Sequence, residues 1–138
     1  RSSAASDVYK RQRYLCEAEQ RTAGGKTLTL ILALNYSSRS EITRAVQRIA
    51  ARVAAGELAP GEISEGTVSA SLDTAPYPNP DLVVRTSGEC RLSNFLLWQA
   101  SYAELYFPEV LWPDFTEEEF DRAIEEYARR DRRFGLVK

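Results

Sequence analysis

Histidine is absent from the 138 residues of this chain. Its absence excludes Ser-His-Asp and Cys-His nucleophile systems, histidine-ligated zinc and a histidine general base among these residues. Cysteine is scarce as well, because only Cys16 and Cys90 occur and they form no Cys-x-x-Cys pair. A disulfide framework or a cysteine-rich metal site is therefore not indicated, and we expect a reducing compartment, the cytoplasm.

The chain also lacks an excess of positive charge and a long apolar run. It has 18 Lys and Arg against 20 Asp and Glu, a net charge of −2, which argues against a nucleic-acid partner held by a basic surface. The longest apolar run, residues 28–34, is interrupted by Thr29 and is too short to span a bilayer. We expect no transmembrane segment.

The N-terminal segment differs in composition from the rest of the chain. Residues 1–12 are rich in Ser and Ala, show no apolar period, and look like a translated sequencing-library adapter. The alternative is a disordered natural tail. In either case we exclude residues 1–12 from the domain and expect residues 13–138 to form it.

Strand and helix patterns alternate along the rest of the chain. Buried strands are predicted at residues 28–36, 81–85 and 104–107. Helices are predicted from residue 41 to about 56, 67 to 72, 93 or 94 to about 103, and 116 to before 135. Ser40 is the expected N-cap of the first of these helices, and Thr116 with Glu119 forms a capping box for the last. The alternation predicts an α/β fold, a parallel sheet with helices on both faces, cut at its N-terminal side.

The loop after the second predicted strand carries the most informative chemistry. Arg85, Ser87, Gly88, Arg91 and Ser93 follow one another where a strand ends. Two guanidiniums, hydroxyls and free backbone N–H groups make an oxyanion receptor, and arginine prefers planar, bidentate partners such as phosphate. The residues therefore predict a phosphate or diphosphate site.

A purely structural interpretation of the same loop, without a bound anion, stays open. Arg85 would then pair with Glu89, Arg91 would be solvated, and Ser93 would serve only as a helix N-cap. If a diphosphate does bind, Mg²⁺ is an expected companion, since it prefers carboxylate oxygens and water. Candidate ligands are Glu89, Glu104 and Asp114, each of which is more commonly a surface or capping residue.

Residues 81–107, DLVVRTSGECRLSNFLLWQASYAELYF, resemble the signature of the cis-prenyltransferases, the undecaprenyl diphosphate synthase family. LALNYSSRSEI at residues 32–42, LWPDF at residues 111–115 and RRFG near the end match that family too. The resemblance implies condensation of isopentenyl diphosphate onto an allylic prenyl diphosphate to give a cis-polyprenyl diphosphate. It also implies a homodimer, with any membrane contact peripheral and made through the lipid product.

The resemblance assigns roles residue by residue. Arg85, Arg91 and Ser93 would hold the diphosphate of isopentenyl diphosphate, with Leu92 contributing backbone. Glu104 would help to bind Mg²⁺. The two C-terminal residues Arg133 and Gly135 would reach the partner subunit's site.

The chain departs from the family pattern in one important respect. The family's catalytic aspartate lies in an N-terminal phosphate-binding loop that finds no match in these residues, so we assign no catalytic residue here and expect this fragment to be inactive alone. Two alternatives remain: a non-catalytic partner subunit of such an enzyme, and a generic anion-binding α/β module. Retention of RTSGE and RLSN argues against the partner subunit.

Overall fold

The computed structural model describes residues 4–130, with side chains from residue 12 onward. The chain divides into two compact units, residues 1–34 and residues 35–138. The first unit contains one helix, α1 (Ala4–Thr22), which begins inside the segment set aside as an adapter-like tail. The exclusion of residues 1–12 from the native domain therefore stays a prediction. No helix within residues 4–130 is both long and apolar enough to cross a membrane.

The strand predicted at residues 28–36 is wrong. Residues 28–33 have no regular secondary structure, and Leu28 and Leu30 are 85% and 78% exposed. An apolar run of this kind becomes a buried strand only when neighbouring strands pair with it and helices cover it. Within the described part of the chain, the sheet consists of two other strands.

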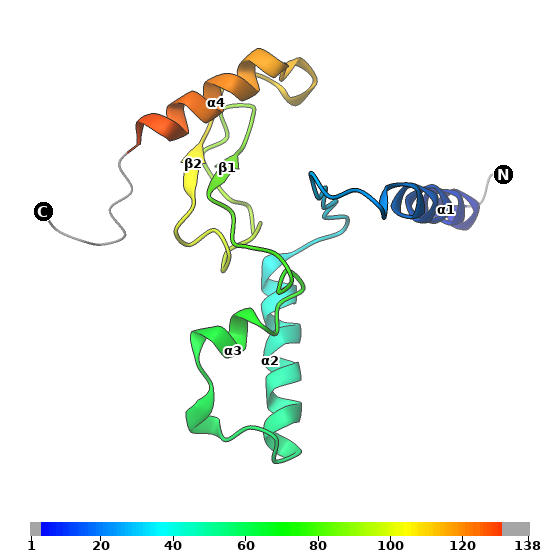
Figure 1. Cartoon of the computed structure of the whole chain (residues 1–138), viewed down its shortest axis with the longest axis vertical. Coiled ribbons are helices and arrows are strands. Elements are labelled where there is room, and N and C mark those ends of the chain that lie inside the picture. The colour runs from blue at the N-terminus through cyan, green and yellow to red at the C-terminus, as the bar shows by residue number, and fades with distance from the viewer. Residues whose placement is uncertain (1–3, 131–138) are drawn as a thin grey trace, which may run out of the picture. The chain divides into compact units, whose positions relative to one another are not determined.

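The second unit contains the parallel sheet. Strands β1 (Leu82–Val84) and β2 (Glu104–Tyr106) pair in parallel, with Leu82 opposite Glu104 and Val84 opposite Tyr106. Helix α4 (Glu117–Arg129) packs against β2 (Figure 1). Both strands lie where the sequence predicted them, and the α/β class with a parallel sheet is confirmed.

Helix α2 (Ser38–Ala54) begins three residues before the predicted start. Its N-cap is Ser37, in the extended conformation, and not Ser40. The helix ends at Ala54, and two residues later the left-handed Gly56 donates its N–H to the carbonyl of Val53. Ala45 and Ile49 of this helix are buried in the core.

Short helices link α2 to the sheet. The 3₁₀ helix η1 (Pro60–Glu62) and helix α3 (Glu65–Ser69) follow α2, and α3 packs beside it (Figure 1). Helix α3 begins two residues before the predicted helix at 67–72, because Ser64 caps it by accepting a hydrogen bond from the Thr67 N–H. A second 3₁₀ helix, η2 (Trp112–Asp114), precedes α4.

The helix predicted from residue 93 or 94 to about 103 is wrong. Residues 93–102 form a series of turns and bends, in which Ser93, Asn94 and Leu96 all have positive φ. Left-handed backbone cannot continue a right-handed helix. The Ser93 and Asn94 side chains make tertiary hydrogen bonds instead, to Arg85 and to Ser37.

Candidate functional site

Arg85 organises the loop that follows β1. Its backbone N–H continues the β1–β2 ladder by donating to the carbonyl of Tyr106 over 2.9 Å. Its Nη1 donates to the carbonyl of Arg91 (2.7 Å) and to Ser93 Oγ (2.8 Å). The side chain is only 28% exposed. Three of the residues predicted to bind a diphosphate are therefore in direct contact.

Glu89 supplies the negative charge in this cluster. Its Oε2 accepts from Arg85 Nη2 at 3.0 Å and also pairs with Arg91. The structural interpretation of this loop is confirmed in one respect, the pairing of Arg85 with Glu89. Arg91 is 62% exposed, but it shares the same carboxylate. One carboxylate thus faces two guanidiniums, which leaves the cluster with a net positive charge and donor capacity for a further anion.

A pocket of about 240 Å³ adjoins the cluster. Its polar lining comes from Arg85 and Arg91, and the rest of its lining is apolar: Val83, Val84, Leu92 and Phe95. Leu92, expected to contribute backbone, therefore also lines the pocket. The combination suits a ligand with an anionic head and a short hydrocarbon group.

The backbone of the loop is fixed by the segment that follows β2. Ser87 and Gly88 both have positive φ, and their N–H groups donate to the carbonyls of Val110 (2.8 Å) and Pro108 (2.9 Å). These N–H groups are therefore engaged and are not free for an anion, contrary to the backbone part of the predicted oxyanion receptor at Gly88. Their role is to hold the loop that carries the arginines.

Glu104 lies at the other end of the strands. It opens β2 opposite Leu82, whereas Arg85 follows the end of β1, a separation of about 10 Å along the strands. Arg130 Nη1 donates to Glu104 Oε2 at 3.0 Å and to the Leu105 carbonyl at 2.9 Å. The bond to Glu104 is the main cause that raises the pKa of Arg130.

The donor set around Glu104 does not form a magnesium site by itself. No group of three or more Asp, Glu or Cys side chains that could hold a metal occurs among residues 12–130. Asp114 lies in η2, and Glu89 is committed to the two arginines. Glu104 as a Mg²⁺ ligand stays a prediction, and Arg133 and Gly135 fall outside the residues that the structure describes.

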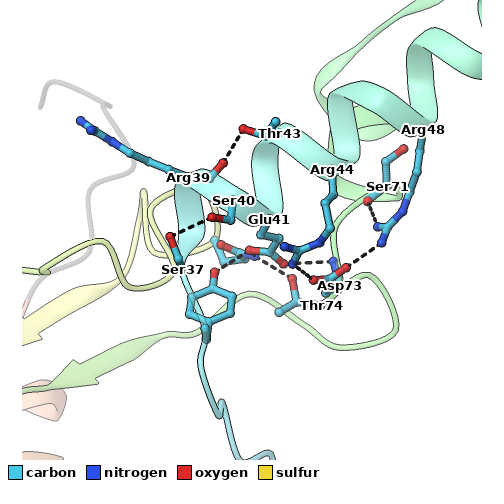
Figure 2. Close-up of polar contacts among 12 residues, drawn as sticks. Ser37, Arg39, Ser40, Glu41, Thr43, Arg44, Arg48, Ser71, Asp73 and Thr74 are labelled. Atoms are coloured by element: carbon cyan, nitrogen blue, oxygen red, sulfur yellow. Dashed lines mark hydrogen bonds and ion pairs between the residues drawn. The ribbon is translucent and has the colours of Figure 1, made fainter.

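A buried carboxylate that sequence reasoning passed over lies at the start of α2. Glu41 has no exposed surface, and its oxygens accept from Tyr36 Oη, from the Asp73 N–H (3.0 Å) and from Gln99 Nε2 (3.1 Å). Gln99 Nε2 also donates to Thr74 Oγ1. Figure 2 shows Glu41 pointing from α2 into this cluster. The sequence contained one indication that Glu41 is buried: it lies four positions before the apolar residue Ala45, on the same face of the helix.

Two arginines on α2 face Asp73 (Figure 2). Arg44 and Arg48 both pair with the Asp73 carboxylate, and Arg48 also donates to the Ser71 carbonyl at 2.7 Å. The hydrogen bonds from Arg44 and then Arg48 hold the pKa of Asp73 below its usual value. These pairs fasten the segment after α3 to α2.

Tyr36 connects the buried carboxylate with the pocket. Its ring meets that of Phe95 edge to face, with centroids 5.6 Å apart. Burial, followed by the hydrogen bond to Glu41, raises the pKa of the Tyr36 phenol. Phe95 itself lines the pocket beside Arg85.

An arginine cluster lies beside an apolar pocket at the carboxyl end of the parallel strands, an arrangement that suits an anion with an apolar group. The family model described as "Putative undecaprenyl diphosphate synthase" (Prenyltransf) matches residues 6–135. The class is thus that of the prenyltransferases. The chain belongs to the undecaprenyl diphosphate synthase family.

Relatives and solved structures agree with this assignment. The isoprenyl transferase of Agrobacterium fabrum is 58% identical over 121 residues, which are 88% of this chain and 49% of that protein. That of Rhizobium meliloti is 52% identical over 135 residues, 98% of this chain and 53% of the relative. The chain spans about half the length of the curated relatives it matches.

Two solved structures share the fold. Lavandulyl diphosphate synthase from Lavandula x intermedia, in complex with dimethylallyl diphosphate, matches with a TM-score of 0.86 and 40% identity over 91% of this chain and 54% of that chain. A probable undecaprenyl diphosphate synthase from Campylobacter jejuni matches with a TM-score of 0.75 and 39% identity, over 92% of this chain and 57% of its own.

Proposed function

We propose that this chain carries the isopentenyl diphosphate-binding part of a cis-prenyltransferase. One observation supports the proposal most strongly: Arg85 and Arg91 flank a pocket whose remaining lining is apolar. Its volume of about 240 Å³ lies below the roughly 300–1,000 Å³ of sites for drug-sized ligands. A five-carbon group on a diphosphate suits this size better than a long prenyl chain.

The proposed binding mode follows from the hydrogen bonds. Diphosphate oxygens accept from the free donors of Arg85 and Arg91 and compete with the Glu89 carboxylate for the rest. Ser93 holds Arg85 in place through its hydroxyl. The isopentenyl group then lies against Val83 and Val84, where its burial excludes water.

The proposed reaction is the family's condensation. The alkene of isopentenyl diphosphate attacks the allylic carbon of a prenyl diphosphate, the allylic diphosphate leaves, and a proton is lost from the new product. This chain's residues bind and orient the isopentenyl diphosphate. We expect the 138 residues alone to bind it without turning it over, because the catalytic aspartate loop has no match in them.

Three parts of the proposal rest on the family resemblance alone. They are Mg²⁺ with Glu104 as one ligand, a homodimer in which Arg133 and Gly135 reach the partner's site, and a cytoplasmic enzyme whose membrane contact is peripheral. Arg130 engages Glu104 Oε2 in this chain, so Mg²⁺ would either bind through Oε1 or compete with Arg130 for Oε2.

Calorimetric titration with isopentenyl diphosphate tests the binding. We expect saturable binding that Arg85→Ala weakens by about tenfold to a hundredfold, since hydrogen bonds to charged groups contribute roughly 1.5–3 kcal/mol. The matched control is Arg129→Ala, which removes a 73% exposed arginine from α4 and should bind normally. Absence of binding, or equal loss in both variants, contradicts the proposal.

Comparison ligands separate the proposal from a generic anion-binding module. Inorganic diphosphate lacks the hydrocarbon group that the apolar lining would cover, so it should bind more weakly than isopentenyl diphosphate. Equal affinity for inorganic diphosphate, sulfate and isopentenyl diphosphate would favour the anion-binding module.

A further inference from the structure

Asn94 joins the pocket loop to the start of α2 through three of its atoms. Its side-chain Nδ2 donates to Ser37 Oγ (2.7 Å), its Oδ1 accepts from the Arg39 N–H (2.9 Å), and its carbonyl accepts from the Ser38 N–H (2.9 Å). The two side-chain bonds join Asn94 to residues that lie 55 and 57 positions earlier in the sequence. The side chain and the carbonyl of one residue therefore bond to three successive residues at the helix start.

The contact continues on both sides of Asn94. Ser38 Oγ accepts from the Leu97 N–H at 3.0 Å, and the Tyr36 ring meets Phe95 edge to face. Ser38 is completely buried. The contact is thus continuous from Phe95, which lines the pocket, to the interior of the unit.

Asparagine suits this position for two physical reasons. Its φ of +65° lies in the left-handed region, which Asn adopts more readily than most residues. Its amide offers a donor and an acceptor together, and both are used here. Alanine would lose both bonds and resist the backbone conformation.

We propose that Asn94 is a positioning residue that couples the pocket formed by Arg85 and Arg91 to the N-terminus of α2. The proposal rests on the proposed function, because it names what positions the isopentenyl diphosphate-binding loop. Ser93, the neighbour of Asn94, accepts from Arg85, so fixing Asn94 also fixes that acceptor. Binding in the pocket and order at residues 36–41 then support each other reciprocally.

Three variants test the coupling. Asn94→Gly removes the side chain without backbone strain, and Asn94→Asp keeps an acceptor for the Arg39 N–H while the Ser37 hydroxyl can donate to it. Ser64→Ala removes the N-cap of α3 and is the control for a general loss of stability.

Calorimetry with isopentenyl diphosphate gives the first measurement. We expect Asn94→Gly to weaken binding by about fivefold to tenfold, as two lost hydrogen bonds imply. Asn94→Asp should recover part of the affinity, and Ser64→Ala should bind normally despite a lower melting temperature. Normal binding by Asn94→Gly, or an equal loss in Ser64→Ala, overturns the proposal.

Amide hydrogen exchange without ligand gives a second, independent measurement. Asn94→Gly should speed exchange at Arg39, which loses its acceptor, and also at Arg91, whose N–H donates to the Glu89 carbonyl within the pocket loop. Faster exchange at Arg39 alone overturns the coupling. If the unsubstituted chain binds no isopentenyl diphosphate, the proposed function fails, and this exchange comparison still decides the role of Asn94.

Discussion

The Arg85 guanidinium donates from Nη1 to Ser93 Oγ over 2.8 Å, although eight positions separate the two residues in the sequence. This bond closes the loop after β1 and directs an arginine along the edge of an apolar pocket. The arrangement is held from both sides, by the strand ladder at Arg85 and by the Asn94 contacts next to Ser93. The proposed anion site is therefore preformed in the folded loop.

Removal of the Ser93 hydroxyl should weaken binding without abolishing it. Ser93→Ala deletes one acceptor of Arg85 but leaves the bond to the Arg91 carbonyl. We expect an affinity for isopentenyl diphosphate about fivefold lower, in line with one hydrogen bond of roughly 1 kcal/mol. Calorimetry checks this, with Ser101→Ala as a hydroxyl-deleting control outside the pocket lining. An unchanged affinity for Ser93→Ala would show that the hydroxyl does not position Arg85.

Removal of the internal counter-charge should strengthen binding. Glu89→Gln frees Arg85 and Arg91 from a carboxylate that competes with diphosphate. We expect affinity to rise by about threefold to tenfold at low salt, and the gain to shrink as salt screens the charges. Glu57→Gln, an exposed position after α2, makes the same charge change away from the pocket. Weaker binding by Glu89→Gln would mean that the carboxylate orients the arginines more than it opposes the ligand.

Acid should remove the stabilisation that Asp73 provides. Its pKa is lowered in the folded state by hydrogen bonds from Arg44 and Arg48, so its contribution is present above the unfolded value and is lost as pH falls below about 4. The pairs are substantially exposed, so the effect should be small, below about 1 kcal/mol. Thermal unfolding of Asp73→Asn against the unsubstituted chain checks this. The difference in melting temperature should be clear at pH 7 and smaller at pH 2.5.

Asp121→Asn provides the comparison for the acid experiment. It changes an exposed carboxylate on α4 and should leave the melting temperature near that of the unsubstituted chain at both pH values. If the Asp73→Asn difference persists undiminished at pH 2.5, the arginine pairs are not its cause.

Tyr36→Phe should lower stability at neutral pH and reduce the further loss of stability at alkaline pH. At pH 7 it removes a donor from the buried Glu41 carboxylate, which should cost about 1–3 kcal/mol of unfolding free energy. The pKa of Tyr36 is raised in the folded state, so its stabilisation is complete below the unfolded pKa and is lost as pH rises through the folded one, above about 10. Tyr36→Phe should therefore lose less stability than the unsubstituted chain between pH 9 and 11. Urea denaturation measures the unfolding free energy of both proteins across this pH range. Parallel curves for Tyr36→Phe and the unsubstituted chain would contradict this role of the Tyr36 phenol.

The sequence predicted the parts of the fold that depend on local pattern. The two short strands follow from continuous apolar runs, and helices α2 and α4 follow from periodic ones. The expected caps are less accurate, because α2 starts after Ser37 rather than Ser40 and the Thr116 side chain makes no capping hydrogen bond at α4. The expected strand at residues 28–36 fails because burial depends on neighbouring strands, which a local pattern does not contain. The expected helix after Ser93 fails because Asn94 bonds to residues that are more than fifty positions away.

The sequence likewise predicted some residues of the candidate site and missed others. Arg85, Arg91 and Ser93 were identified from residue chemistry and a family signature, and the structure places them in one cluster. The linking roles of Asn94 and Glu41 were missed, since each resembles an ordinary cap or first-turn acid in sequence. Only their tertiary partners distinguish them.

Methyl and guanidinium NMR with isopentenyl diphosphate tests the central claim most directly. The methyl signals of Val83, Val84 and Leu92 should shift together with the side-chain signals of Arg85 and Arg91, along one saturable curve. Inorganic diphosphate should move the arginine signals and leave the methyl signals nearly unchanged. Shifts confined to other parts of the chain, or arginine shifts without methyl shifts when isopentenyl diphosphate is added, would contradict the account.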